Sequence, residues 1–174
     1  MIPSNRQWVT NEFATAPEDK ALILALHHPV YSFDDHHSGS AAMADAVQHA
    51  INDSRRVPNL VLTAHVHNYQ RIERHIDGKM AIPFIVAGAG GYYHLHGMTA
   101  DNGHVDRDLG AKLMFHDQYH HSYVLISVDK DNITGTMIPI AETGSSKHKH
   151  DAEPDTFRYP AQLIKLEDGV IVSL

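Results

Sequence analysis

Three continuous apolar runs mark the first half of the chain, at residues 21–26, 60–64 and 84–87. Short runs without alternation are typical of strands covered on both faces, as in the parallel sheet of an α/β protein. Between the first two runs, apolar residues recur at helical spacing and predict a helix at about 41–54. The pattern also predicts a helix at about 5–15, which opens with the capping-box spacing of Ser4 and Gln7.

A strand, a helix and a second strand within residues 21–64 form a βαβ unit, so we expect an α/β fold. The first strand runs into His27, and the second runs into His65, with His67 two positions later. The carboxyl ends of parallel strands meet at one edge of an open sheet, where ligands bind. An extended backbone would place His65 and His67 on the same side. Two imidazoles at such an edge suit a metal ion or a phosphate group.

The second half of the chain has a weaker pattern. Alternating residues predict a β-hairpin over 120–140, with a turn at 129–132. Two short apolar runs separated by Asp168-Gly169 predict a closing hairpin within 157–174. We therefore divide the chain into a catalytic-type region at 1–140, a polar loop at 141–156 and closing strands at 157–174.

Composition narrows the chemistry. The chain has 174 residues, no cysteine and 16 histidines. The absence of cysteine excludes disulfides, thiolate metal sites and cysteine nucleophiles. A net charge of −7 argues against a general nucleic-acid binder, and no apolar run is long enough to span a membrane. Many histidines occur in pairs, including His94 and His96, which follow the glycine-rich turn at 88–91 and are candidates to line a pocket.

The histidine motifs resemble those of the calcineurin-like metallophosphoesterases, and most closely those of the purple acid phosphatase branch. In that branch a histidine precedes a proline, and a histidine pair follows nine and ten positions later. Here His27 lies before Pro29, with His36 and His37 at these spacings. The segment Ala64-His65-Val66-His67-Asn68-Tyr69-Gln70-Arg71 is similar to the family's Gly-His-x-His-x-Tyr-Glu-Arg, with alanine for glycine and glutamine for glutamate. The resemblance covers about residues 6–128.

The resemblance implies a fold, a reaction and a set of residues. The fold would be the C-terminal half of a metallophosphoesterase α/β sandwich. His27 and His65 would bind one metal, and His67 the second, with Fe, Mn or Zn as the ions. His36 and His37 would contact the substrate phosphate or protonate the leaving group, and His94 is a weaker candidate for substrate contact. The reaction would be hydrolysis of a phosphate ester by a metal-activated hydroxide.

The family builds the rest of its dinuclear centre from N-terminal carboxylate motifs, and this sequence does not contain them. We therefore expect the chain to supply the histidine half of a site and to need the missing N-terminal half or a complementary chain. The expected partner is a phosphate-ester substrate, with neither nucleic acid nor membrane. The sequence does not fix the compartment, although the resemblance points to an extracytoplasmic one.

Two alternatives remain at this stage. A cupin also uses His-x-His followed by a glutamate, and Glu73 lies nearby, but cupins are all-β and place that glutamate sooner. The second alternative is a catalytically incomplete protein, or pseudoenzyme, that keeps the histidines as a metal-binding domain. A nucleotide-binding loop at Gly88-Ala89-Gly90-Gly91 is disfavoured because the lysine of a P-loop is absent. Asp34 and Asp35 are interpreted as solvated loop residues.

Overall fold

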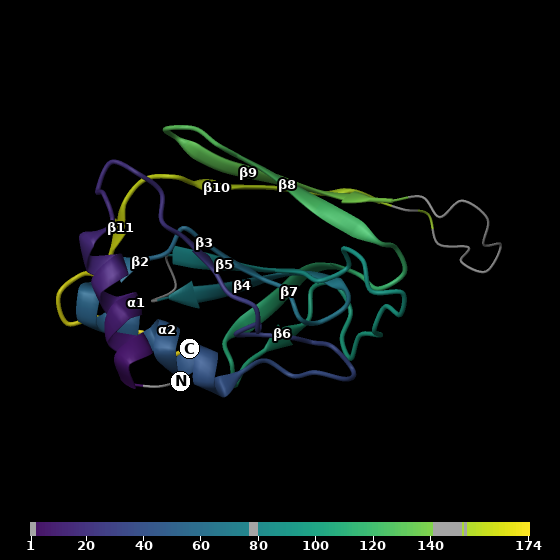
Figure 1. Cartoon of the computed structure of the whole chain (residues 1–174), viewed down its shortest axis with the longest axis horizontal. Coiled ribbons are helices and arrows are strands. Elements are labelled where there is room, and N and C mark those ends of the chain that lie inside the picture. Colours follow the sequence, from purple (N-terminus) through teal and green to yellow (C-terminus); the bar gives the residue numbers. More distant parts are fainter. Residues whose placement is uncertain (1–2, 77–79, 141–150, 152) are drawn as a thin grey trace.

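A six-stranded mixed sheet forms the centre of the molecule in the computed structural model, which describes residues 3–76, 80–140, 151 and 153–174 (Figure 1). Its strand order is β1-β3-β5-β4-β7-β6. β1, β3 and β5 are parallel, whereas β4 is antiparallel to β5 and β7, and β6 is antiparallel to β7. The strands are β1 (Ile23–Ala25), β3 (Leu60–Thr63), β4 (Tyr69–Ile76), β5 (Met80–Ala87), β6 (Val105–Asp106) and β7 (Ala111–Asp117).

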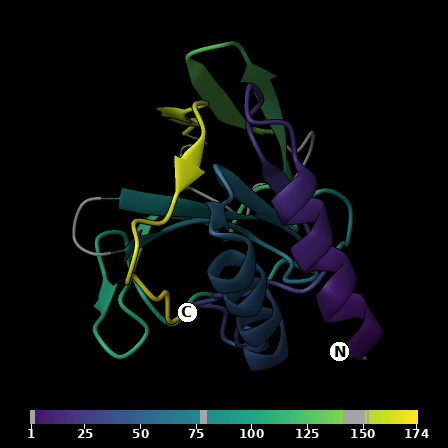
Figure 2. The same cartoon turned by 90° about the vertical axis from the view of Figure 1, so that its left-hand side faces the viewer.

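Two helices cover one face of this sheet (Figure 2). They are α1 (Pro3–Thr15) and α2 (Ala41–Ser54). The α2 helix begins where the Ser40 side chain accepts a hydrogen bond from the backbone N–H of Met43, and ends at Arg55, whose φ is 61°. Its apolar face contributes Val47 and Ile51 to the core between helices and sheet. Burial of this face, rather than helix propensity, supplies most of the stability of a helix of this length.

A second, three-stranded antiparallel sheet covers the opposite face. It consists of β8 (Ser122–Val128), β9 (Asn132–Pro139) and β10 (Asp155–Pro160), in the order β10-β9-β8. Met137 and Phe157 from this sheet pack against Leu60 and Ile85 of the central sheet. The fold is therefore an α/β sandwich of helices, mixed sheet and antiparallel sheet, which confirms the expected class and excludes an all-β cupin barrel.

A buried ion pair joins the two sheets. Arg71 on β4 donates from Nε and Nη2 to the two carboxylate oxygens of Asp155 on β10, at 2.7 and 2.9 Å. The hydroxyl of Tyr69 donates to the same carboxylate at 2.8 Å. Burial, followed by the charge of Asp155, raises the pKa of Tyr69 and keeps its hydroxyl protonated as a donor. These contacts hold β10 against β4, the strand that follows the loop at residues 64–68, which we call the histidine loop.

Several predicted elements are confirmed. The helix at 41–54, the parallel strands before His27 and His65, and the hairpin over 120–140 are all present. The capping-box serine and most of the polar loop at 141–156 lie outside the described side chains.

The closing hairpin predicted within 157–174 is wrong. β10 pairs with β9, and β11 (Ile164–Lys165) pairs with β2 (Arg56–Val57), so the two C-terminal runs join different sheets. Asp168 and Gly169 do form a turn, and Gly169 has a φ of 82°. β4 and β7 were not predicted.

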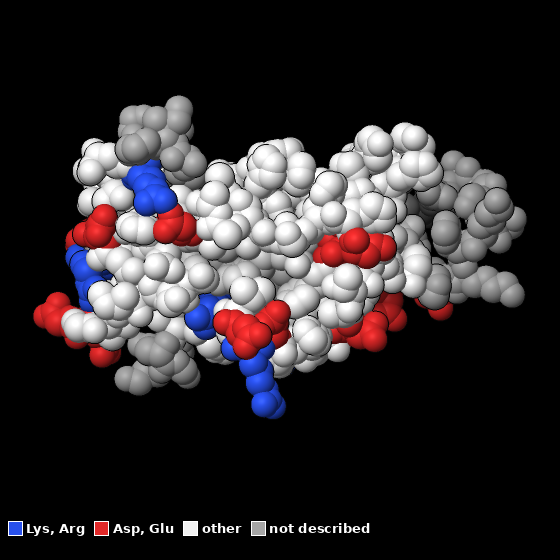
Figure 3. Space-filling model, turned by 90° about the horizontal axis from the view of Figure 1, so that it is seen from below, with Lys and Arg blue, Asp and Glu red and all other residues white. Residues whose placement is uncertain are grey.

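The surface is more acidic than basic. On the face shown in Figure 3, the few lysine and arginine side chains lie beside acidic ones. Neither α1 nor α2, as far as the structure describes them, has the length and apolar character needed to cross a membrane.

Candidate metal centre

The parallel strands bring the first two predicted ligands together. β1 and β3 are adjacent, and their pairing continues past the strand ends, where the N–H of Ala64 donates to the carbonyl of His27 at 3.1 Å. Nε2 of His27 consequently lies 3.1 Å from Nδ1 of His65. Residues 38 positions apart thus meet because both follow neighbouring parallel strands.

The backbone turns sharply after β3. His65 has a φ of 64°, a left-handed conformation that non-glycine residues seldom adopt. The N–H of Val66 donates to Ala64, and that of Asn68 donates to Val66. The extended backbone expected through His65 and His67 is therefore wrong, although both side chains border one depression of about 320 Å³.

The two rings face different neighbours. His65 faces the imidazoles of His28 and His37, with ring centroids 4.2 and 5.1 Å away. His67 lies 4.5 Å from the ring of His96 and 4.2 Å from that of Tyr92. Seven imidazoles together form what we call the histidine cluster, composed of His27, His28, His36, His37, His65, His67 and His96.

The cluster favours neutral imidazoles at two predicted ligands. Burial, and then the neighbouring imidazoles led by His28, lower the pKa of His65. Burial and the proximity of His96 likewise lower the pKa of His67. Neutral imidazole is the form that binds metals, so both groups are in a suitable state near neutral pH.

One atom in the cluster lacks a partner. Nδ1 of His67 is buried, and no described residue forms a hydrogen bond with it. A buried polar atom without a partner is costly and uncommon in native proteins. The imidazole donor set and this orphaned nitrogen both fit a metal ion at the depression.

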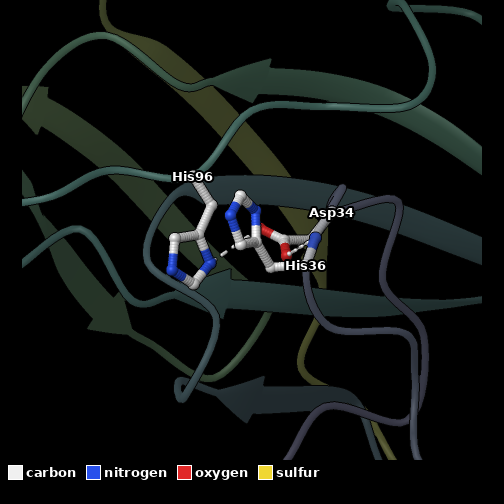
Figure 4. A group of neighbouring side chains, drawn as sticks. All are labelled: Asp34, His36 and His96. Carbon is white, nitrogen blue, oxygen red and sulfur yellow. Dashed lines mark hydrogen bonds and ion pairs between the residues drawn. The ribbon is translucent and has the colours of Figure 1, made fainter.

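Asp34 organises the loop between β1 and α2, a role that the sequence analysis missed (Figure 4). Its side chain is fully buried, which overturns its interpretation as a solvated residue, whereas Asp35 is exposed. One carboxylate oxygen accepts hydrogen bonds from the backbone N–H groups of His36 and His37. The other lies 3.1 Å from Nδ1 of His96. An aspartate two residues before His36 and His37 is typical of an Asx turn. Nothing in the neighbouring sequence indicates that its side chain is buried.

The remaining predicted residues lie at different depths. His36 is exposed and pairs through Nδ1 with Asp35, a contact that raises the pKa of His36. His37 is exposed at the rim of the cluster. His94 is exposed, with its ring 4.1 Å from that of Tyr93, and its role in substrate contact stays a prediction.

Gly88 fixes the approach of β5 to the histidine loop. A Cβ at this position would overlap the backbone carbonyl of Val66, which cannot move aside as a flexible side chain could. We expect Gly88→Ala to destabilise the fold by on the order of 3 kcal/mol in urea unfolding, because the strand end must shift. Gly91→Ala is the matched control, since its Cβ meets no atom within 4 Å. Equal stability of the two variants would contradict this assignment.

Comparison of the chain with models of known protein families gives no match, and comparison with characterised proteins gives no relative. The chemistry must therefore be argued from the geometry. A group of imidazole nitrogen donors around one depression is suited to first-row transition metals rather than to Ca²⁺ or Mg²⁺.

Proposed function

We propose that this chain supplies the histidine half of a dinuclear metal centre in a phosphoesterase of the purple acid phosphatase type. The observation that carries the proposal is the convergence of His27, His65 and His67 on one depression at the carboxyl edge of parallel strands. The motif spacing of these residues and of the pair His36 and His37 agrees with the resemblance to that family.

Each histidine has a proposed role. His27 and His65 hold one metal, and His67 holds the other, with Fe, Mn or Zn as the ions. When bound, the two metals would clamp the phosphoryl group and supply the hydroxide nucleophile. His36 and His37 contact the substrate phosphate, and one of them protonates the leaving group. The raised pKa of His36 suits this proton donor, because it retains its proton at higher pH than an ordinary imidazole.

The donor set is incomplete for two metals. In the part of the chain that the structure describes, no carboxylate forms a hydrogen bond or ion pair with His27, His65 or His67. Imidazoles alone leave the charge of two metal ions uncompensated, and a bridging carboxylate would compensate it. We therefore propose that carboxylates from outside these 174 residues complete the site.

The open edge of β1 is the proposed place for that addition. β1 is the outermost strand of the central sheet and, among the residues that the structure describes, pairs with β3 alone. Beside it, α1 and β1 border an apolar pocket of about 440 Å³, and the neighbouring Trp8 side chain is 62% exposed. A further parallel strand here would bring its own carboxyl end, and any carboxylate on it, next to His27.

Metal content and hydrolysis of an aryl phosphate test the function. The full-length native gene product is expected to contain two metal ions and to hydrolyse 4-nitrophenyl phosphate. The isolated 174 residues are expected to be at least about 100-fold slower, because a ligand set lacking carboxylates holds metal poorly. Equal rates for the two proteins would disprove the half-site proposal.

The alternative is a non-catalytic metal-binding domain. The lack of any carboxylate that bonds or pairs with His27, His65 or His67, within the described residues, is the observation that favours it. A native gene product that holds metal and hydrolyses no phosphate ester would establish this alternative over the enzyme.

A further inference from the structure

A second group of metal-binding side chains lies at the other end of the histidine cluster. Asp34, His36 and His96 each offer one ligand atom, and these atoms all lie within 4.8 Å of one another (Figure 4). Asp34 and His36 come from the loop after β1, whereas His96 comes from the loop after β5. The rings of His36 and His96 are stacked, with centroids 4.6 Å apart. Two loops distant in sequence thus converge on one point.

The donor set is two imidazoles and one carboxylate. This combination binds Zn²⁺ or Fe²⁺ in many proteins and leaves at least one coordination position for water or another ligand. It also differs from the set at His27, His65 and His67, because it contains its own carboxylate. The group therefore needs no ligand from another chain to balance part of the metal's charge.

The spacing of the Asp34 and His96 ligand atoms is close to that around a coordinated ion, and the His36 ligand atom lies within 4.8 Å of both. Nδ1 of His96 and Oδ2 of Asp34 are 3.1 Å apart. Two ligand atoms at about 2.0–2.1 Å from a tetrahedral metal lie roughly 3.3 Å from each other. An ion could therefore replace the hydrogen bond with a displacement of a few tenths of an ångström. Nδ1 of His96 would release its proton on binding the ion.

The surrounding contacts hold the ligands in place. The Asp34 carboxylate also accepts hydrogen bonds from two backbone N–H groups and, at 3.0 Å, from the side-chain amide of Asn68. His36 pairs through Nδ1 with Asp35, which leaves its Nε2 for a metal. A ligating histidine whose other nitrogen bonds to a carboxylate is the arrangement that usually orients metal ligands.

We infer that Asp34, His36 and His96 bind one divalent transition-metal ion, Zn²⁺ or Fe²⁺, at a site separate from the proposed dinuclear centre. The site lies entirely within this chain. It does not depend on the phosphoesterase proposal, because it requires none of His27, His65 and His67. With the ion bound, His36 is a ligand, and the proposed role of proton donor falls to His37.

Titration of the metal-free 174-residue chain with Co²⁺ and Zn²⁺ tests the inference. Co²⁺ should give the visible absorption bands of a low-symmetry nitrogen and oxygen site, and Zn²⁺ should displace it at one ion per chain. We expect His96→Gln and His36→Gln each to weaken this binding by at least about 10-fold to 100-fold. His75→Gln is the matched control, since His75 is exposed and lies near the carboxylate of Glu73.

The variant His65→Gln distinguishes binding at this site from binding at the proposed dinuclear centre. It should leave the high-affinity Co²⁺ bands and the stoichiometry unchanged. Loss of the bands in His65→Gln with retention in His96→Gln would overturn the inference, as would absence of any binding by the wild-type chain. Phosphoesterase turnover plays no part in this readout, so failure of the proposed enzyme activity would leave the result standing.

The variant Asp34→Asn is expected to retain the conformation of the loop between β1 and α2. Asparagine retains one side-chain oxygen, which can still accept from the backbone N–H groups of His36 and His37. We expect native circular dichroism with Co²⁺ affinity lowered at least about 10-fold. Native circular dichroism together with wild-type affinity in both Asp34→Asn and His36→Gln would contradict the assigned ligand set.

Discussion

Replacing His65 by glutamine in the full-length native gene product is expected to remove at least one metal ion and to lower aryl phosphate hydrolysis by at least about 100-fold. Loss of an outer-shell partner of a metal ligand already costs about 10-fold to 100-fold, so loss of a ligand should cost no less. His65 lies 3.1 Å from His27, on the edge where both strands end. Metal analysis and steady-state kinetics on the same preparation provide the measurement.

His49→Gln is the control for this experiment. His49 is exposed on α2 and bonds to the backbone carbonyl of Asp45, away from the histidine cluster. It should retain full metal content and turnover. If His65→Gln also retains both, the assignment of His65 as a ligand is wrong. Glutamine leaves the residue at position 65 with the same left-handed backbone requirement, so the comparison isolates the imidazole.

Asp155→Ala is expected to produce the largest loss of stability, about 3–5 kcal/mol in the free energy of unfolding. The Asp155 side chain is 5% exposed and forms a bidentate pair with Arg71. Its removal leaves the Arg71 guanidinium with only the longer ion pair to Glu73, at 3.9 Å, and leaves the Tyr69 hydroxyl without its acceptor. Removing one partner of a buried bidentate ion pair costs far more than the intact pair contributes.

Urea unfolding followed by circular dichroism measures this effect. Thr156→Ala, on the exposed side of the same strand, is the control and should change stability by less than about 0.5 kcal/mol. Similar transition midpoints for the two variants would show that the pair does not hold β10 onto the central sheet.

The correct predictions of the fold concern segments whose pattern of apolar and polar residues matches the burial of those residues in the structure. The helix at 41–54 was predictable because its apolar residues fall on one face. β4 escaped prediction because it carries Gln70, Arg71 and Glu73, which find partners from distant segments. Glu73, for example, accepts from the hydroxyl of Tyr159 at 2.7 Å. A strand whose polar residues are satisfied by another layer does not show simple alternation.

The strand partners of β10 and β11 could not be predicted from the sequence for a related reason. Local sequence indicates that residues 155–160 and 164–165 are extended, but strand partners are chosen by packing across the whole sheet. The alternation of Phe157 with exposed neighbours fits a half-buried strand equally well in a local hairpin or beside β9.

The candidate site was predictable where topology alone decides it. Parallel strands must end at the same edge, so the meeting of His27 and His65 followed from two apolar runs. The positions of Asp34 and His96 did not follow, because they depend on how two loops fold onto each other. Their proximity rests on bonds such as that from Asn68 to Asp34, between residues 34 positions apart.

The left-handed backbone at His65 has a consequence for engineering. Such a conformation costs a side chain about 1–2 kcal/mol relative to glycine, which adopts it freely. A procedure that optimises this chain for thermal tolerance would therefore choose glycine or asparagine at position 65. The gain would come from relief of the backbone strain, and it would remove the imidazole that lies 3.1 Å from His27 and is proposed as a metal ligand. Stability and the proposed ligand are opposed at this residue, and position 65 should be held fixed in any stabilised variant used to test metal binding.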